Sequence, residues 1–331
     1  MSFERSATQR LFYREAIARA LREKMAADPS VFVMGQDVGA FGGAYREFDG
    51  LFAAFGPARV RDTPVAEAAM IGIGLGAAAA GLRPVVSITY MDFIMLGLDP
   101  LVNYGAKLRY KTAGRLTAPL LLKTTAGAKG QGVAHSQCIE AWLMGVPGLK
   151  LVAPATPDDA YGLMIAALEE PGPVVFIDHK KLFPGAGEVA VAPHRTPLGK
   201  ARIIRPGTDV TITTHSYMTR VALDAAALLQ IQGLSCEVID LRTLLPLDLD
   251  LIAASVARTG ALVTLEEGQL TCGVGAEVAA QVQRALGPLK VHRIGALAAP
   301  VSSNPVLERA CIPDAARVAA EVEFATKRSG R

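Results

Sequence analysis

Residues 62–93 read DTPVAEAAMIGIGLGAAAAGLRPVVSITYMDF, and this stretch predicts a helix followed directly by a buried strand. Its first half is rich in Ala and Gly as far as Gly81, which favours a helix that packs closely against its neighbours. Pro84–Tyr90 is a short, mainly apolar run, which is typical of a strand buried on both faces. A small-residue helix that leads into such a strand indicates an α/β fold.

The alternation of helices and strands continues on both sides of this stretch. Upstream we predict a helix, a strand and a second helix: Phe12–Met25, Val31–Met34 and Arg46–Phe55. Downstream we predict a helical region over Phe93–Tyr110, strands over Leu120–Thr124, Leu149–Ala153 and Val174–Asp178, and a helix from Thr156 to about Glu169. The last helix begins with Thr-Pro-Asp-Asp, which supplies a capping hydroxyl, a proline in the first turn and acids near the positive helix end.

The periodicity disappears over residues 183–199, where FPGAGEVAVAPHRTPLG is rich in proline and glycine. We interpret this segment as a linker between two domains. Further strands are predicted after it, near Val210–Thr214, Glu237–Asp240, Leu262–Leu265 and Val291–Ile294. The sequence therefore predicts an α/β protein with two parallel-sheet domains, over residues 1–182 and 200–331.

The composition limits the classes of protein to which the chain can belong. Of its 331 residues, 51% are hydrophobic and 20% charged, which excludes an intrinsically disordered chain. The formal net charge is +3 without a basic stripe, so we expect no nucleic-acid partner. The four cysteines lie far apart, which favours thiols in a reducing cytoplasm over disulfides or a zinc site. The uncharged stretch Ala68–Leu82 is shorter than the ~20 residues of a spanning helix, so we expect a cytoplasmic protein with no membrane partner.

Several catalytic motifs are absent or misplaced. Residues 74–79, GLGAAA, fit the G-x-G-x-x-A pattern of dinucleotide-binding turns, but they lie well inside a predicted helix, where close packing explains the glycines better. The sequence contains no G-x-x-x-x-G-K-[ST] and no G-x-S-x-G, so neither a P-loop nor a serine-hydrolase elbow is supported.

Two residues are the stronger candidates for a functional site. Glu67 follows a strand-to-helix junction among small apolar residues, so it either caps its own helix or is a buried carboxyl that can share a proton near neutral pH. His135 lies in a glycine-punctuated loop and is either structural or catalytic. Phe93 is a core residue by default.

Eight segments occur in an order that carries a family resemblance. They are DTPVAEA (62–68), GAAAAGLRPVV (76–86), MDF (91–93), HSQ (135–137), PGLKLVAPATPDDA (147–160), PLGKA (197–201), VIDLRTLLPLD (238–248) and EEG…GVGAE (266–277). Together they closely resemble the beta subunit of thiamine diphosphate-dependent 2-oxo acid dehydrogenases. This group includes the pyruvate, branched-chain 2-oxo acid and acetoin dehydrogenases and is related to transketolase. The resemblance covers about residues 10–325.

The resemblance implies a transketolase-like pyrimidine-binding domain over residues 1–182, a linker over 183–199 and a transketolase C-terminal domain over 200–331. It also implies thiamine diphosphate as the cofactor, with the diphosphate and Mg²⁺ held by an alpha subunit through a Gly-Asp-Gly…Asn motif. This sequence contains no Gly-Asp-Gly. The implied assembly is therefore a heterotetramer of two alpha and two beta chains, which would act with a dihydrolipoyl acyltransferase core.

The resemblance also implies roles for individual residues. Glu67 would hydrogen-bond the aminopyrimidine ring nitrogen and so favour the tautomer that activates the thiazolium carbon. Phe93 would pack on the pyrimidine, and Thr89 and Val65 would line the same pocket. His135 would lie near the reacting carbon and the lipoyl arm, where it would orient the intermediate or pass protons.

Some members of the family hold a structural K⁺ with main-chain carbonyl groups. The corresponding positions in this sequence are Leu120, Ala167, Glu170 and Gly172. Carbonyl ligation leaves almost no signature in the side chains, so the resemblance alone carries this expectation.

The sequence departs from the family pattern where the substrate is expected. Ser87 stands where a glutamate is common, and Thr89 where a larger side chain is common. The segment before His135, residues 124–134, also differs from the family pattern. Elsewhere in the chain, Pro100 falls in a helix that the family continues. Lys129 is either a solvated loop lysine or a contact for an anionic substrate such as a sugar phosphate. These departures leave the identity of the substrate open.

Three hypotheses about function follow. The chain is a dehydrogenase beta subunit that decarboxylates or cleaves a 2-oxo acid or acetoin and transfers the acyl group to lipoamide. Alternatively, it is the C-terminal subunit of a split transketolase that moves a two-carbon ketol unit between sugar phosphates. The third hypothesis is a non-catalytic structural partner, against which the presence of Glu67, Phe93 and His135 argues.

Overall fold

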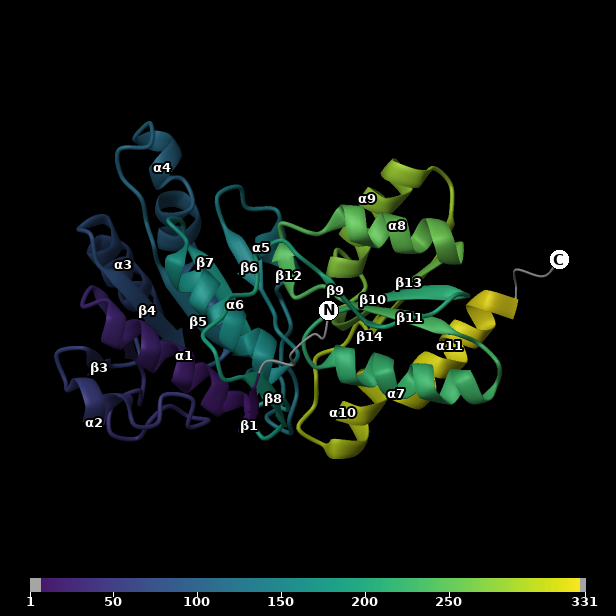
Figure 1. Ribbon diagram of the computed structural model, residues 1–331, viewed down its shortest axis with the longest axis horizontal. Coiled ribbons are helices and arrows are strands. Elements are labelled where there is room, and N and C mark those ends of the chain that lie inside the picture. The colour runs from purple at the N-terminus through teal and green to yellow at the C-terminus, as the bar shows by residue number, and fades with distance from the viewer. Residues whose placement is uncertain (1–6, 328–331) are drawn as a thin grey trace. The chain divides into compact units, whose positions relative to one another are not determined.

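The computed structural model describes residues 7–327, and these residues form two compact units (Figure 1). The first unit consists of the chain up to residue 126 together with residues 145–198. The second unit consists of residues 127–144 and the chain from residue 199 onward.

A parallel sheet forms the centre of the first unit. Its strands lie in the order β6-β7-β5-β4-β2-β3, and each neighbouring pair is parallel. The strands are β2 (Val31–Gly35), β3 (Val60–Asp62), β4 (Arg83–Ile88), β5 (Leu121–Ala126), β6 (Lys150–Val152) and β7 (Val174–His179). β2, β5 and β7 are buried along their whole length, as expected for strands covered on both faces.

The helices of the first unit pack in two groups. They are α1 (Tyr13–Ala27), α2 (Leu51–Phe55), α3 (Glu67–Ala79), η1 (Met91–Gly97), η2 (Asp99–Gly105), α4 (Leu108–Lys111) and α6 (Pro157–Glu169). α1 packs against α6 (Figure 1). α3 packs against β4, η1 and η2. A Cβ atom on Gly74 of α3 would lie 2.6 Å from the Val86 side chain of β4. Close packing, rather than a dinucleotide-binding turn, therefore accounts for this glycine.

The second unit has a mixed sheet in the order β14-β13-β10-β11-β9, in which only β9 runs antiparallel to its neighbour. The strands of this sheet are β9 (Arg202–Arg205), β10 (Val210–Thr214), β11 (Cys236–Asp240), β13 (Ala261–Gln269) and β14 (Lys290–Ala296). The short strand β12 (Thr243–Leu245) belongs to the same unit but not to this sheet. Its helices are α5 (Ala141–Met144), α7 (Met218–Ile231), α8 (Leu249–Thr259), α9 (Val274–Leu286), α10 (Pro305–Cys311) and α11 (Ala315–Lys327). Both units thus have the α/β architecture that the sequence predicts.

Two predicted helices differ from those in the structure. The helix predicted over Arg46–Phe55 covers only Leu51–Phe55, because Arg46 (φ 63°) and Gly50 (φ 74°) take left-handed conformations. The helical region predicted over Phe93–Tyr110 consists of the 3-10 helix η1, the π-helix η2 and the short helix α4. Pro100 lies in η2, and because it has no N–H, regular α-helical bonding cannot continue through it.

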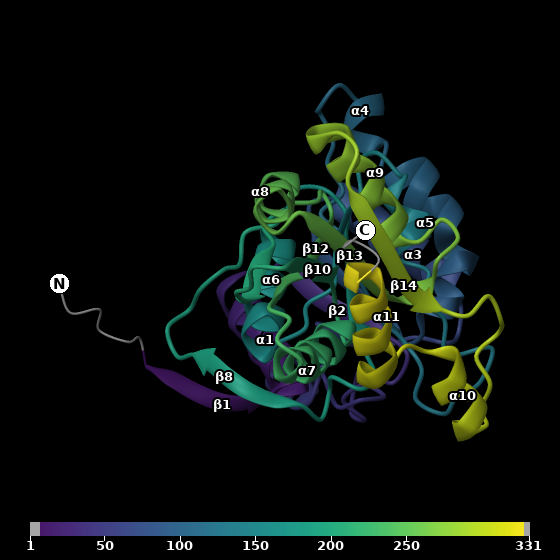
Figure 2. The same ribbon diagram turned by 90° about the vertical axis from the view of Figure 1, so that its right-hand side faces the viewer.

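A two-stranded antiparallel ribbon pairs β1 (Thr8–Phe12) with β8 (Ala186–Ala190) (Figure 2). β8 lies inside residues 183–199, which the sequence pattern predicts to be a linker. The hydroxyl of Thr8 donates a hydrogen bond to Glu188 at 2.7 Å across the ribbon. Since the two strands are far apart in sequence, the local pattern gives no sign of this pairing.

The start of α6 follows the prediction closely. Thr156 is the N-cap, and its hydroxyl accepts a hydrogen bond from the backbone N–H of Asp159 at 3.1 Å. Pro157 occupies the first helical position, where its missing N–H costs nothing. Within residues 7–327, no helix is both long and apolar enough to cross a membrane.

Candidate functional site

Most of the candidate residues of the first unit lie at the carboxyl ends of three neighbouring parallel strands. Gln36 follows β2, Val65 and Glu67 follow β3, and Thr89 follows β4. β2 lies between β3 and β4 in the sheet, so these segments meet at one edge. This is the edge at which open parallel sheets bind their ligands.

Glu67 is the first residue of α3 and is 6% exposed. Its only side-chain hydrogen bond to a described residue comes from Gln36, whose Nε2 lies 3.4 Å from Glu67 Oε1. The side chain does not cap its own helix, and the second carboxylate oxygen is open to an external donor. The positive end of α3 favours a negative charge at this position. The site therefore combines burial with an available acceptor.

An apolar surface accompanies this carboxylate. η1, which carries Phe93, packs against α3. The Phe93 ring lies edge-on to Tyr90, with centroids 6.5 Å apart and planes at 67°. Val65 is 74% exposed although it is apolar. A flat ring with polar nitrogens needs apolar contact together with a polar partner, and Phe93, Val65 and Glu67 supply side chains of these two kinds.

A buried ionic network that no sequence motif indicates lies in the same unit. Lys123 Nζ lies 2.7 Å from Asp178 Oδ2 and 3.1 Å from Glu47 Oε1, and all three side chains are nearly inaccessible to solvent. Tyr13 donates a hydrogen bond to Asp178 at 3.0 Å. Burial opposes the charged form of Lys123, but the two carboxylates more than offset it and raise its pKa. The network thus holds the ammonium in its charged form.

His135 belongs to the second unit and is half-buried. Its backbone N–H donates to the carbonyl oxygen of Gly132 at 3.2 Å, which closes a tight turn just before the imidazole. Val133, Ser136 and Gln137, which flank His135, line a cavity of about 470 Å³. The loop is therefore one wall of an open space in this unit.

A second buried acid–base pair involves Glu140, which follows the HSQ segment closely in the sequence. His215 Nε2 lies 2.9 Å from Glu140 Oε1, and both side chains are buried. Burial disfavours the charged imidazole, but Glu140, assisted by Glu266 and Asp240, more than offsets this and raises the pKa of His215. No sequence motif singled out His215, because its partner lies 75 positions away.

Glu266, the first acid of the EEG segment, binds the beginning of α9. Its two carboxylate oxygens accept the backbone N–H groups of Val274 at 2.8 Å and Gly275 at 3.0 Å. A Cβ atom on Gly275 would lie 2.2 Å from the Thr264 hydroxyl oxygen, so the helix start can approach β13 only with glycine there. Burial raises the pKa of the Glu266 carboxyl. The EEG…GVGAE pattern therefore has a structural use in this unit.

The four carbonyl positions of the K⁺ expectation gather near the turn between α6 and β7. The carbonyl oxygen of Leu120 accepts the N–H of Val174 at 2.9 Å, and that of Ala167 accepts the N–H of Glu170 at 3.3 Å. Glu170 and Gly172 line a cavity of about 250 Å³. A carbonyl oxygen has two lone pairs, so the carbonyl oxygens of Leu120 and Ala167 each keep one lone pair beyond these hydrogen bonds.

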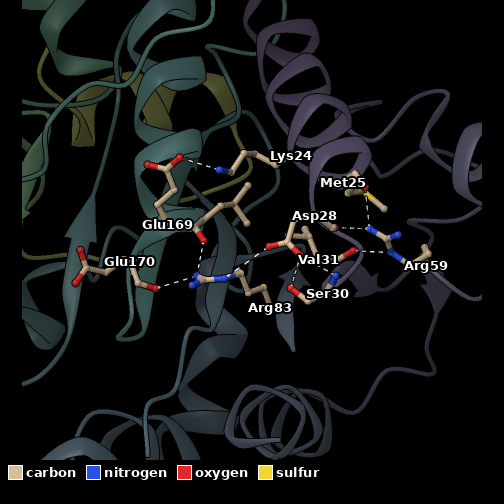
Figure 3. Close-up of polar contacts among 10 residues, drawn as sticks. Lys24, Met25, Asp28, Ser30, Val31, Arg59, Arg83, Glu169 and Glu170 are labelled. Atoms are coloured by element: carbon tan, nitrogen blue, oxygen red, sulfur yellow. Dashed lines mark hydrogen bonds and ion pairs between the residues drawn. The ribbon is translucent and has the colours of Figure 1, made fainter. Parts of the chain in front are cut away.

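Arg83, the first residue of β4, fixes the same turn (Figure 3). Its Nη1 donates to the carbonyl oxygens of Leu168 at 2.7 Å and Glu170 at 3.4 Å, and its Nε lies 3.8 Å from Asp28. Hydrogen bonds from Ser30, with the charge of Arg83, hold the pKa of Asp28 below its ordinary value. Within the described residues, no group of three or more His, Cys, Asp and Glu side chains could hold a metal ion.

Comparison with known proteins identifies both parts of the chain. Residues 9–185 match the family "Transketolase, pyrimidine binding domain", and residues 199–318 match "Transketolase, C-terminal domain". Among solved structures, "Split gene transketolase, inactive beta4 tetramer" is similar with a TM-score of 0.79 and 26% identity, over 95% of this chain and 98% of that chain.

Two groups of proteins share a higher sequence identity with this chain than the split-gene transketolase does. "Pyruvate dehydrogenase E1 component subunit beta-1, mitochondrial" of Oryza sativa subsp. japonica is 44% identical over 316 residues, which cover 93% of this chain and 84% of the rice protein. "Pyruvate dehydrogenase E1 component subunit beta" of Rickettsia bellii is 43% identical over 82% of this chain and 84% of that protein. "Acetoin:2,6-dichlorophenolindophenol oxidoreductase subunit beta" of Cupriavidus necator is 38% identical over 94% and 96%.

These similarities favour the dehydrogenase hypothesis over the split transketolase, since the named beta subunits share more of the sequence than the transketolase does. They also confirm the resemblance drawn from the eight sequence segments. The chain belongs to the family of beta subunits of thiamine diphosphate-dependent 2-oxo acid dehydrogenases, which is built on the transketolase-like fold.

Proposed function

We propose that this chain, together with an alpha subunit, decarboxylates a 2-oxo acid or cleaves acetoin and transfers the acyl group to lipoamide. The observation that carries the proposal is the buried carboxylate of Glu67 with one oxygen open at the ligand-binding edge of a parallel sheet. The most similar relatives reported above are named as pyruvate dehydrogenase and acetoin oxidoreductase beta subunits, which supports these two substrate classes.

Thiamine diphosphate, when bound, supplies the electron sink that a 2-oxo acid needs to lose carbon dioxide. The residues of this chain would bind its pyrimidine end. Glu67 would hydrogen-bond the ring nitrogen and hold a proton there, with Gln36 keeping its carboxylate in place. Phe93 would pack on the flat ring, while Val65 and Thr89 would exclude water from its edge. His135 would orient the reacting group or pass a proton to it.

The alpha subunit is part of the proposal because the diphosphate needs a binding motif that this sequence does not contain. The sequence contains no Gly-Asp-Gly, so the Mg²⁺ and diphosphate would be held by the partner's Gly-Asp-Gly…Asn motif in an assembly of two alpha and two beta chains. The similar split-gene transketolase is described as an inactive tetramer of beta chains, which supports this division of labour. A dihydrolipoyl acyltransferase core would receive the acyl group.

Residues 1–182 would act as the pyrimidine-binding domain, residues 183–199 as the linker and residues 200–331 as the C-terminal domain. Leu120, Ala167, Glu170 and Gly172 would hold a K⁺ ion that, together with Arg83, stiffens the turn after α6. The protein would act in the cytoplasm, although the rice relative is named mitochondrial.

The test is dye reduction by the complex of this chain with its alpha chain. The complex is assayed with 2,6-dichlorophenolindophenol and pyruvate, branched-chain 2-oxo acids or acetoin, each with and without Mg²⁺ and thiamine diphosphate. We expect cofactor-dependent reduction with at least one substrate. A complex that binds the cofactor but reduces no dye, and instead transfers a ketol unit between sugar phosphates, would replace the proposal with the split transketolase.

A further inference from the structure

The loop of residues 127–137 has little conformational preference of its own. It contains three glycines with positive φ, namely Gly127 (87°), Gly130 (77°) and Gly132 (75°). The loop is closed by a long hydrogen bond from the N–H of Gly127 to the carbonyl oxygen of Gln137, at 3.5 Å. Because glycine permits many backbone conformations, contacts from outside the loop must select the one that places His135.

Two carboxylates hold the first half of this loop by its backbone. The N–H of Ala128 donates to Glu267 Oε1 at 2.8 Å, and Glu267 lies on β13 and is buried. The N–H of Gly130 donates to Glu308 Oε2 at 2.6 Å, and Glu308 lies on α10. Hydrogen bonds from an N–H to a carboxylate are about twice as strong as those between neutral groups.

The helix that carries Glu308 is itself well anchored. Asn304 caps α10 and accepts the N–H of Val306 at 2.9 Å, and the last residue of the helix, Cys311, accepts the N–H of Leu297 at 3.0 Å. A Cβ atom on Gly132 would lie 3.2 Å from Ser303, so the loop also packs against the segment before the helix. A displacement of α10 would therefore move the loop.

We propose that Glu308, together with Glu267, is a positioning residue that fixes the 127–137 loop and through it the imidazole of His135. Glu308 acts on the loop backbone and does not touch the substrate. We call the two hydrogen bonds from the loop backbone to Glu267 and Glu308 the clamp. Gly130 is two residues from Gly132, whose carbonyl oxygen accepts the N–H of His135, so the clamp lies next to the turn that carries the imidazole. The inference rests on the catalytic role of His135 in the proposed function.

Removal of the Glu308 carboxylate and removal of the Glu267 carboxylate should differ in their effect on folding. Gly130 is exposed and Glu308 half-exposed, so water can replace their hydrogen bond in Glu308→Ala and the fold should survive. Ala128 is fully buried, so Glu267→Ala would leave a buried N–H without a partner and threaten folding. Glu308→Ala is therefore the informative variant, and Glu308→Gln, which keeps an acceptor oxygen, is its conservative counterpart.

The first measurement is hydrogen exchange of the loop amides in the complex with the alpha chain, and it needs no catalysis. We expect residues 127–137 to exchange about tenfold faster in Glu308→Ala, with near-normal protection restored in Glu308→Gln. Glu277→Ala is the matched control, because Glu277 is exposed in the same unit and its carboxylate accepts, among the described residues, a hydrogen bond from Gln281 of its own helix. Unchanged protection of the loop in Glu308→Ala would overturn the clamp.

The second measurement is a double-mutant cycle on dye reduction. We expect Glu308→Ala to lower kcat about tenfold with less than a twofold change in KM, and to have no further effect once His135 is replaced by Ala. Equal effects of Glu308→Ala in both backgrounds would mean that Glu308 acts by another route and would refute the inference. If His135→Ala alone leaves kcat unchanged, the catalytic role in the proposed function fails, while the exchange measurement still decides whether the clamp exists.

Discussion

Replacement of Lys123 by methionine tests the buried network of the first unit. Methionine has a similar length and no charge, so the packing between the Phe48 and Phe183 rings, which lie 5.3 and 5.4 Å from the ammonium, is largely kept. The change leaves the carboxylates of Asp178 and Glu47 buried without their cation. Removing one partner of a buried ion pair costs about 3–5 kcal/mol of unfolding free energy.

The expected thermal effect follows from this magnitude. For a domain of about 150–250 residues, 1 kcal/mol corresponds to roughly 2–4 °C, so Lys123→Met should lower the Tm by about 10 °C. The stability difference between Lys123→Met and the wild type should become smaller toward acid pH, because the carboxyl groups of Asp178 and Glu47 need no cation once they are protonated. In the wild type, the pKa of Lys123 is raised above its ordinary 10.5, so the stabilisation persists through neutral pH and is lost only as the pH rises through that raised pKa.

The assay is urea and thermal unfolding of the full chain followed by circular dichroism at pH 5, 7 and 9. Lys24→Met is the matched control, because Lys24 pairs with Glu169 at 2.7 Å on the surface of the same unit and is expected to contribute at most about 1 kcal/mol. Adding Asp178→Asn to Lys123→Met should restore part of the lost stability. If Lys123→Met costs no more than Lys24→Met, the argument from burial is wrong.

Three further predictions concern other parts of the chain. The pKa of His215 is raised by its pair with Glu140, so this pair stabilises the wild type fully below pH 6.5 and stops doing so as the pH rises through the raised pKa. Urea unfolding should therefore show His215→Gln to be less stable than the wild type below pH 6.5, with the difference disappearing above that pKa. Burial raises the pKa of Cys236 to about 11, so iodoacetamide at pH 8 should label the exposed Cys272 long before Cys236, as peptide mass spectrometry would report; equal labelling would contradict this. Gly148→Ala should cost more than about 2 kcal/mol in the same unfolding assay, because Gly148 has φ 95° and a Cβ atom would lie 2.0 Å from a main-chain carbonyl oxygen.

Local sequence patterns predicted the elements whose causes are local. Thr156 and Pro157 correctly predicted the start of α6, because helix capping depends on residues that are adjacent in the sequence. The glycines of α3 indicated close packing, and the contact of Gly74 with Val86 bears this out. By contrast, the β1–β8 ribbon was missed because its two strands lie at opposite ends of the first unit's sequence.

The same distinction holds for the candidate site. Glu67 stood out because an acid among small apolar residues is unusual, and the structure places it buried at the start of α3. The pairing of Lys123 could not be predicted from the sequence, because its partners Glu47 and Asp178 lie 76 and 55 positions away. A lysine inside an apolar strand does not indicate which acids it pairs with. Charge pairs formed by tertiary contact need the fold before they can be recognised.

The most direct test of the central claim is the activity of Glu67→Gln in the complex with the alpha chain and Mg²⁺–thiamine diphosphate. Gln keeps the size of the side chain but cannot hold the proton, so dye reduction should fall at least a hundredfold with unfolding free energy nearly unchanged. Glu277→Gln, an exposed acid in α9, should retain full activity. Activity of Glu67→Gln within a factor of two of the wild type would contradict the assignment of Glu67 and the function built on it.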